Sequence, residues 1–255
     1  MELYDTHCHL DEDIFDPDRE EAIQRMAESG VRRALVVGYD METSLRAAAC
    51  AERFPALRAA VGIHPRWSAA REAGDIDRLA ELLHRREVRA IGEIGLELGR
   101  ADDPPLENQS RMCEDQLILA ADLNKPVCLH IIRAHENMLS LLKRFGGRVK
   151  GVCHGFSGSW ELAQAYLKLG LYIGIGGVVT WPTSKKAVRC AEMIPADRLL
   201  LETDSPWQTL SPHQGGRNEP AYLPLILRRV AEIRGEDIER LAEQTTANAI
   251  ALFGE

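Results

Sequence analysis

The cysteines of this sequence are neither paired nor clustered. Its 255 residues include six cysteines, and no two of them have the Cys-x-x-Cys spacing. They are spread along the chain as Cys8, Cys50, Cys113, Cys128, Cys153 and Cys190. This scattering is not that of a disulfide framework in a secreted protein. We therefore expect a reduced, intracellular protein.

The sequence also lacks an excess of positive charge. It has 31 Lys and Arg against 39 Asp and Glu, which gives a formal net charge of −8. This balance disfavours a broad basic surface for nucleic acid. It does not exclude a nucleic-acid enzyme that meets phosphate through bound cations, because such ions are then the largest local charges.

Long apolar runs are absent as well. No segment approaches the roughly 18–20 apolar residues of a membrane span, and the stretch 171–179 is short and rich in glycine. The first residues lack the basic segment and apolar run of a signal peptide. We expect a soluble, cytoplasmic protein that does not bind a membrane.

Short runs of Val, Ile and Leu alternate with longer amphipathic stretches along the whole chain. After an opening strand that leads into His7, strands are predicted at 31–37, 57–63, 88–94, 126–130, 149–154, 171–175 and 199–204. Helical patterns lie between and after them, for example at 41–53, 107–123, 160–169, 221–233 and 237–252. Eight strands, each followed by helical material, predict an α/β fold: one (β/α)8 TIM barrel domain over residues 1–255. A doubly wound sheet is less consistent, because no glycine-rich phosphate loop follows the first strand.

The candidate site begins with His7 and His9. Side chains alternate along a strand, so these two imidazoles point the same way and Cys8 points the opposite way. Two imidazoles on one side of a strand end can bind one metal ion. The pair alone is weak evidence, because His-x-His also arises by chance.

Further residues of metal-binding type fall at the C-terminal ends of the predicted strands. They are His64, Glu93, His130, His154 and Asp204. In a barrel these ends meet on one face, where active sites are built. Each residue taken alone could instead cap a turn or be a hydrogen-bonded core residue. Glu93, however, stands among apolar residues and glycines, where a buried carboxylate needs a cation or several donors. Together these residues predict a metal site on the C-terminal face of the barrel.

The same alternation places Glu202 on the face of Asp204, one layer deeper in the barrel, and Cys128 likewise below His130. Glu202 is a candidate for orienting a metal ligand, with a structural ion pair as the alternative. Cys8 and Cys153 point away from the ligand side, and we expect them to pack in the core.

Six motifs stand in a recognisable order. They are Asp5-Thr6-His7-Cys8-His9-Leu10-Asp11, Gly62-Ile63-His64-Pro65, Ile91-Gly92-Glu93-Ile94-Gly95-Leu96, Pro126-Val127 with His130, His154-Gly155-Phe156-Ser157-Gly158, and Leu200-Leu201-Glu202-Thr203-Asp204-Ser205-Pro206. This order, over nearly the whole chain, resembles the TatD family of metal-dependent hydrolases and is closest to its YjjV-type branch. The resemblance implies an amidohydrolase-like barrel, a centre of one or two metals, and phosphodiester hydrolysis, typically as a deoxyribonuclease.

The resemblance also implies roles for single residues. His7 and His9 would hold one ion together with Glu93 and Asp204. Glu93 would bridge to a second ion, held by His130 and His154. His64 resembles the family histidine that approaches the substrate phosphate.

The sequence departs from the family pattern at three places. Glu97 stands where the family usually has Asp. The family arginine two places after His130 is replaced by Ile132, with Arg133 one step later, so a phosphate contact is in question. Trp207-Gln208-Thr209 replaces the commoner continuation after Ser205-Pro206.

The mechanistic hypothesis is hydrolysis by a metal-activated water. Two divalent ions (Zn, Mn, Ni, Co or Mg) would lower the pKa of a bound water from about 15.7 towards about 7, with Glu93 bridging and Asp204 accepting the proton. The expected substrate is DNA or a small phosphodiester, and no obligate protein partner is evident. Related barrels share this ligand geometry, so hydrolysis of a small amide, lactone or ester is the alternative. A non-enzymatic metal-dependent binding protein is the second alternative.

Overall fold

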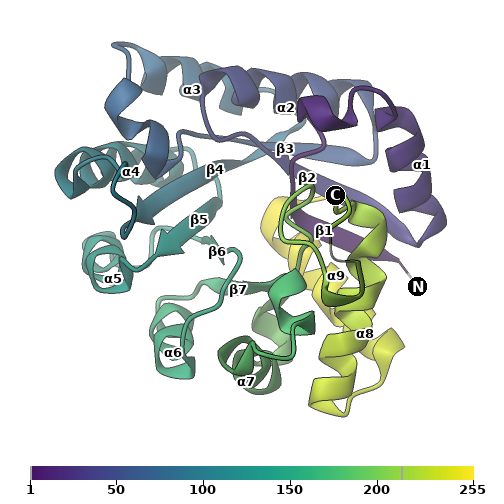
Figure 1. Ribbon diagram of the computed structural model, residues 1–255. Helices are drawn as coiled ribbons and strands as arrows, with labels where there is room; N and C mark the ends of the chain where they lie inside the picture. The colour runs from purple at the N-terminus through teal and green to yellow at the C-terminus, as the bar shows by residue number, and fades with distance from the viewer. Residues whose placement is uncertain (1, 214) are drawn as a thin grey trace.

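Parallel strands form the centre of the protein. The computed structural model describes residues 2–213 and 215–255, and within them eight parallel strands make one sheet in chain order. The strands are β1 (Leu3–Cys8), β2 (Val31–Val37), β3 (Leu57–Val61), β4 (Val88–Glu97), β5 (Val127–Ile132), β6 (Gly151–Cys153), β7 (Tyr172–Ile175) and β8 (Leu199–Leu201). The helices surround this ring of strands (Figure 1). The predicted (β/α)8 barrel is confirmed.

The helices follow the strands in alternation. They are α1 (Arg19–Glu28), α2 (Met41–Arg53), α3 (Asp75–Leu83), α4 (Leu106–Asp122), α5 (His135–Lys143), α6 (Trp160–Lys168), α7 (Lys185–Met193), α8 (Leu223–Arg234) and α9 (Ile238–Phe253). Helix α2 has the predicted bounds because local signals fix both ends. The Asp40 carboxylate accepts from the Thr43 amide, the Thr43 hydroxyl accepts from the Asp40 amide, and Pro55 stands beyond the last turn.

The sheet closes between β8 and β1 through residues that follow β8. Cys8 and Ser205 form an isolated parallel bridge. The His9 amide donates to the Ser205 carbonyl at 2.7 Å, and the Asp204 amide donates to the His7 carbonyl at 2.8 Å. The closure of the barrel therefore holds Asp204 directly beside the two histidines of the first motif.

Buried and mostly apolar side chains, with one tyrosine, fill the barrel interior. They are Tyr4, Leu35, Val37, Ala60, Ala90, Cys128, Val152 and Leu200, and they pack together with Ala249 and Phe253 of α9. The side chains of Arg58 and Arg89, near the starts of β3 and β4, each donate to the Glu255 carbonyl at 2.9 Å. Helix α9 therefore covers the N-terminal end of the barrel, opposite the predicted site.

A register shift in β1 turns its histidines toward the site. Tyr4 belongs to the interior cluster, whereas Cys8 packs in the outer layer between strands and helices. Regular alternation would place both on one face. The pairing of β1 with β2 shifts between Asp5 and Cys8, and this bulge reverses the faces. Cys8 points away from the site, as predicted.

Strand β4 has a similar irregularity at its candidate ligand. Its pairing with β5 shifts between Ile91 and Ile94. Gly92 faces the interior, because a Cβ added there would lie 2.6 Å from the Cβ of Cys128. The next residue, Glu93, nevertheless points into the site as well, which a regular strand does not allow.

Three predicted strands run past the observed C-terminal ends, and the first of them, 57–63, corresponds to β3, which ends at Val61. The predicted strands 149–154 and 199–204 correspond to the shorter β6 and β8, so His154 and Asp204 lie just beyond the strands. The cause is local backbone geometry: Asp204 has φ 55° and Gly155 also has φ 55°, values that no strand adopts. None of the helices in the described part of the chain is both long and apolar enough to cross a membrane.

Candidate metal centre

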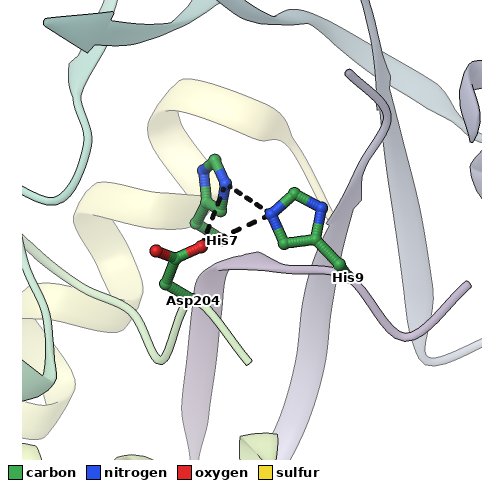
Figure 2. A group of neighbouring side chains, drawn as sticks. All are labelled: His7, His9 and Asp204. Atoms are coloured by element: carbon green, nitrogen blue, oxygen red, sulfur yellow. Dashed lines mark hydrogen bonds and ion pairs between the residues drawn. The ribbon is translucent and has the colours of Figure 1, made fainter. Parts of the chain in front are cut away.

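Two imidazoles and a carboxylate meet where the barrel closes (Figure 2). The Nε2 atoms of His7 and His9 are 3.2 Å apart. Asp204 Oδ1 lies 3.7 Å from His7 Nε2 and 3.4 Å from His9 Nε2. All three residues are buried. Donor atoms around one tetrahedral ion with bonds of about 2.0–2.1 Å stand roughly 3.3 Å apart, so this group has the spacing of a divalent-cation site.

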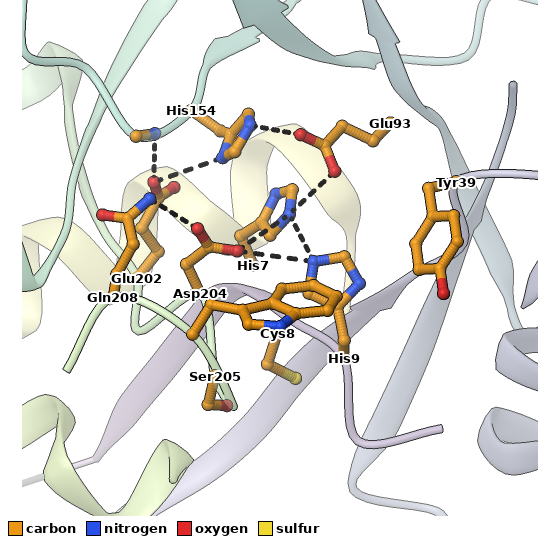
Figure 3. Close-up of polar contacts among 12 residues, drawn as sticks. His7, Cys8, His9, Tyr39, Glu93, His154, Glu202, Asp204, Ser205 and Gln208 are labelled. Atoms are coloured by element: carbon orange, nitrogen blue, oxygen red, sulfur yellow. Dashed lines mark hydrogen bonds and ion pairs between the residues drawn. The ribbon is translucent and has the colours of Figure 1, made fainter. Parts of the chain in front are cut away.

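A second group forms around Glu93. Its Oε1 lies 2.7 Å from His130 Nδ1 and 2.6 Å from His154 Nε2, and these two nitrogens are 3.2 Å apart. The other oxygen, Oε2, lies 3.7 Å from His7 Nε2. Figure 3 shows Glu93 reaching toward His154 and His7 with its two oxygens. One carboxylate therefore faces both groups, which is the arrangement of a bridging ligand.

The surroundings keep both site carboxylates ionised. Burial alone would raise the pKa of Glu93, but the nearby imidazoles of His154 and His130 hold it well below its ordinary value. Burial also opposes ionisation of Asp204, and the hydrogen bond with His9 nevertheless lowers its pKa. Two buried negative charges at the bottom of a cavity attract cations.

Glu202, which follows β8, lies beside His154. Its Oε1 accepts a hydrogen bond from the Gly155 amide and lies 3.7 Å from His154 Nδ1. Gly174 leaves the room for this buried carboxylate, because a Cβ at that position would lie 2.3 Å from Glu202 Oε2. The His154 ring thus has the Glu93 carboxylate close to Nε2 and the Glu202 carboxylate at ion-pair distance from Nδ1, and the two charges favour this orientation of the ring.

His64, from the segment after β3, and Glu97, at the end of β4, approach the second group. Glu97 Oε2 lies 3.3 Å from His130 Nε2 and 3.9 Å from His64 Nε2. His64 Nδ1, however, accepts a hydrogen bond from the Arg66 amide at 3.1 Å, so its proton must be on Nε2. Burial lowers the pKa of His64 to about 3, which keeps the ring neutral. His64 therefore presents an N–H group to the cavity and not a lone pair for a metal.

A cavity of about 350 Å³ opens over both groups. It is lined by His9, Tyr39, His64, Arg66, Trp67, Glu93, Glu97, Arg100, His130, Ile131, Ile132, His154, Gly155, Asp204, Trp207 and Gln208. The structure thus brings together every predicted site residue. His7 lies beneath the cavity, where its ring stacks on the ring of His154 with the two centroids 3.9 Å apart.

The cavity also contains residues that the sequence analysis did not select. Ile132 lines it, whereas the Arg133 side chain lies against Gly99. Its cationic side chains come instead from Arg66 and Arg100. Tyr39 follows the C-terminal end of β2. A search for aromatic residues at the C-terminal ends of predicted strands, like the search that found the metal-type residues, would have selected it.

Comparison with known proteins decides the family. The family described as TatD-related DNase matches residues 4–254. The chain belongs to this family. YabD of Bacillus subtilis, named an uncharacterized metal-dependent hydrolase, is 38% identical over 98% of this chain and 98% of its own. TatD of Escherichia coli, named a 3'-5' ssDNA/RNA exonuclease, is 37% identical over 99% of each chain.

A solved structure of a TatD homologue agrees with the fold. YjjV of Escherichia coli superposes with a TM-score of 0.94 and 36% identity, over 99% of this chain and 98% of that one. The family and branch predicted from the motifs are therefore confirmed, and with them the expectation of a hydrolase.

Proposed function

We propose that this TatD-family hydrolase is a phosphodiesterase, acting on DNA or a small phosphodiester with two divalent ions. In this proposal His7, His9 and Asp204 hold one ion. His130 and His154 would hold the other, and Glu93 would contribute to both positions. The observation that carries the proposal is the placement of Glu93, whose Oε1 faces His130 and His154 while its Oε2 faces His7.

The donor set fits metals that accept mixed nitrogen and oxygen ligation. Imidazole and carboxylate together suit Zn, Mn, Ni or Co, and Mg suits the position richer in oxygen. Bound ions of this kind supply a water that is deprotonated near neutral pH and neutralise charge on phosphoryl oxygens.

We propose that Asp204 accepts the proton of the attacking water. Its Oδ1 faces His7 and His9, and its Oδ2 accepts from Gln208 Nε2 at 2.5 Å. Its φ of 55° is uncommon for a residue other than glycine, and backbone strain of this kind gathers at functional sites. The closure of the barrel supports this strained position through the bond from the Asp204 amide to the His7 carbonyl.

We propose that His64 and two arginines bind the substrate phosphate. The tautomer of His64 directs Nε2–H into the cavity, so it can donate to a phosphoryl oxygen without changing charge. Arg66 and Arg100 line the same cavity and supply the positive charge that Ile132 cannot. Arg66 is paired with Asp102 at 3.2 Å, and Arg100 lies 3.9 Å from Glu97, so both guanidinium groups are held near the rim.

The test replaces Asp204 by Asn in protein reconstituted with each candidate metal. Loss of a proton acceptor should lower turnover of single-stranded DNA and of bis(p-nitrophenyl) phosphate by about 10²–10⁴-fold, with the fold retained by circular dichroism. Asp197→Asn is the matched control, because Asp197 is exposed beside β8 and outside the cavity. Unchanged turnover in Asp204→Asn would refute the role of Asp204. Hydrolysis of a lactone or amide but of neither phosphodiester would refute the proposed substrate class, and full metal content without turnover on any of them would favour a binding protein.

A further inference from the structure

One wall of the cavity is made of aromatic rings. The ring centroids of Tyr39 and Trp67 are 4.8 Å apart, and those of Tyr39 and Trp207 are 6.3 Å apart. These rings come from three separate segments: the loop after β2, the 3-10 helix η2 (Pro65–Ala70) and the loop after β8. The arrangement is therefore built by the fold and not by neighbours in sequence.

The aromatic wall touches the metal centre directly. The ring centroids of Trp207 and His9 are 4.5 Å apart. Those of Trp67 and His64 are 5.7 Å apart, with the two rings edge to face. In Figure 3, Tyr39 lies beyond His9 on the side away from Asp204. A group bound against these rings is consequently adjacent to the atoms that would hold the metal and the phosphate.

A hydrogen bond holds the Tyr39 ring and another holds the backbone of Trp67, while both indole rings are open to solvent. The Tyr39 hydroxyl donates to Glu12 Oε1 at 2.8 Å, and the Trp67 amide donates to the His64 carbonyl at 2.9 Å. Trp67 is nevertheless 37% exposed and Trp207 is 45% exposed. Large exposed apolar groups that line a cavity mark a binding surface.

We propose that Tyr39, Trp67 and Trp207 form a subsite that stacks a nucleobase of the substrate. The inference rests on the proposed phosphodiesterase function, and it specifies the substrate class as a nucleotide-containing phosphodiester. Flat aromatic faces accept the π-face of any base, so the subsite has little preference among bases. The cationic groups of the cavity are Arg66 and Arg100, so the phosphate is bound by them while the base lies against the aromatic wall.

The experiment compares dinucleotides that differ only in their bases. Thymidylyl-thymidine and its analogues with a tetrahydrofuran abasic sugar on the 5' side, the 3' side or both carry the same phosphodiester, so they test the subsite whatever the polarity of cleavage. We expect kcat/KM for thymidylyl-thymidine to exceed that of the doubly abasic analogue by about tenfold or more, mainly through KM. Trp207→Ala and Trp67→Ala should each reduce this ratio severalfold, and Trp207→Phe should retain most of it. Ile118→Ala is the control, because Ile118 is 46% exposed on α4, outside the cavity.

Binding of thymidine 5'-monophosphate supplies a measurement that does not need turnover. We expect it to quench tryptophan fluorescence with higher affinity than deoxyribose 5-phosphate, and Trp207→Ala to remove the difference. Hydrolysis without any base preference, in wild type or variants, would overturn the subsite and leave the phosphodiesterase proposal standing. Base-dependent binding without hydrolysis of any phosphodiester would support the subsite and refute the proposed function. Neither hydrolysis nor base-dependent binding would overturn both.

Discussion

Replacing His9 by Ala tests whether the two groups of ligands are separate metal positions. His9 Nε2 contacts His7 Nε2 at 3.2 Å and Asp204 Oδ1 at 3.4 Å, all within the first group. His9 is a better choice than His7, because the His7 ring stacks on His154 with an interplanar angle of 12°. Removing His7 would disturb both positions, whereas removing His9 leaves His130, His154 and Glu93 with their contacts.

The expected result is the loss of one ion of two. Changing residues that only orient a metal ligand weakens binding about 10–100-fold, so losing a ligand itself should weaken the first position by about 100-fold or more. Metal content after dialysis, measured by mass spectrometry, should fall from two ions per chain to one, and calorimetric titration should show one tight site. His84→Ala is the control, because His84 is exposed at the end of α3. Retention of both ions, or loss of both, would refute the separate positions.

Three further outcomes follow from the same contacts. Glu202→Gln should weaken metal binding about 10–100-fold in a chelator competition, because the His154 ring loses its orienting carboxylate; unchanged affinity would contradict that role. Gly174→Ala should lower the free energy of unfolding by about 1–3 kcal/mol in urea denaturation, since its Cβ would lie 2.3 Å from Glu202 Oε2, and a neutral effect would show that Glu202 can move away. Metal affinity should rise with pH, because His154 must lose a proton before it binds a metal. Burial lowers the pKa of His154, but the charge of Glu93 raises it well above its ordinary value, so the metal-free ring is protonated. Titration heats that are identical in buffers of different ionisation enthalpy would contradict proton release.

Much of the fold is predictable because its signals are local. The strand 31–37 and the helix 41–53 have the predicted bounds, since an apolar run, a capping box and a proline each act over a few residues. The convergence of His64, Glu93 and His130 is predictable too, because the topology of parallel strands places their C-terminal ends together.

The remaining features depend on contacts that the sequence does not display. The bulges that turn His7 and Glu93 into the site arise from pairing with β2 and β5, segments distant in the chain. The position of Asp204 beside the first motif depends on the hydrogen bond from its amide to the His7 carbonyl, almost two hundred residues away. The tautomer of His64 follows from one amide hydrogen bond, and only coordinates show it.

Helix α9 limits the side from which substrate and product reach the site. Helix α9 lies across the N-terminal end, and side chains fill the interior. Among the described residues, the two groups of candidate metal ligands are therefore open to solvent at the C-terminal face. Substrate then enters and product leaves by the same mouth. A polymer cannot pass through such a site, so it must enter with an end or a bend. A product that stays bound to the metal-ligand residues or to the aromatic wall delays binding of the next substrate. For the proposed nucleotide substrate, a barrel closed at its N-terminal end therefore predicts inhibition by the released nucleotide product.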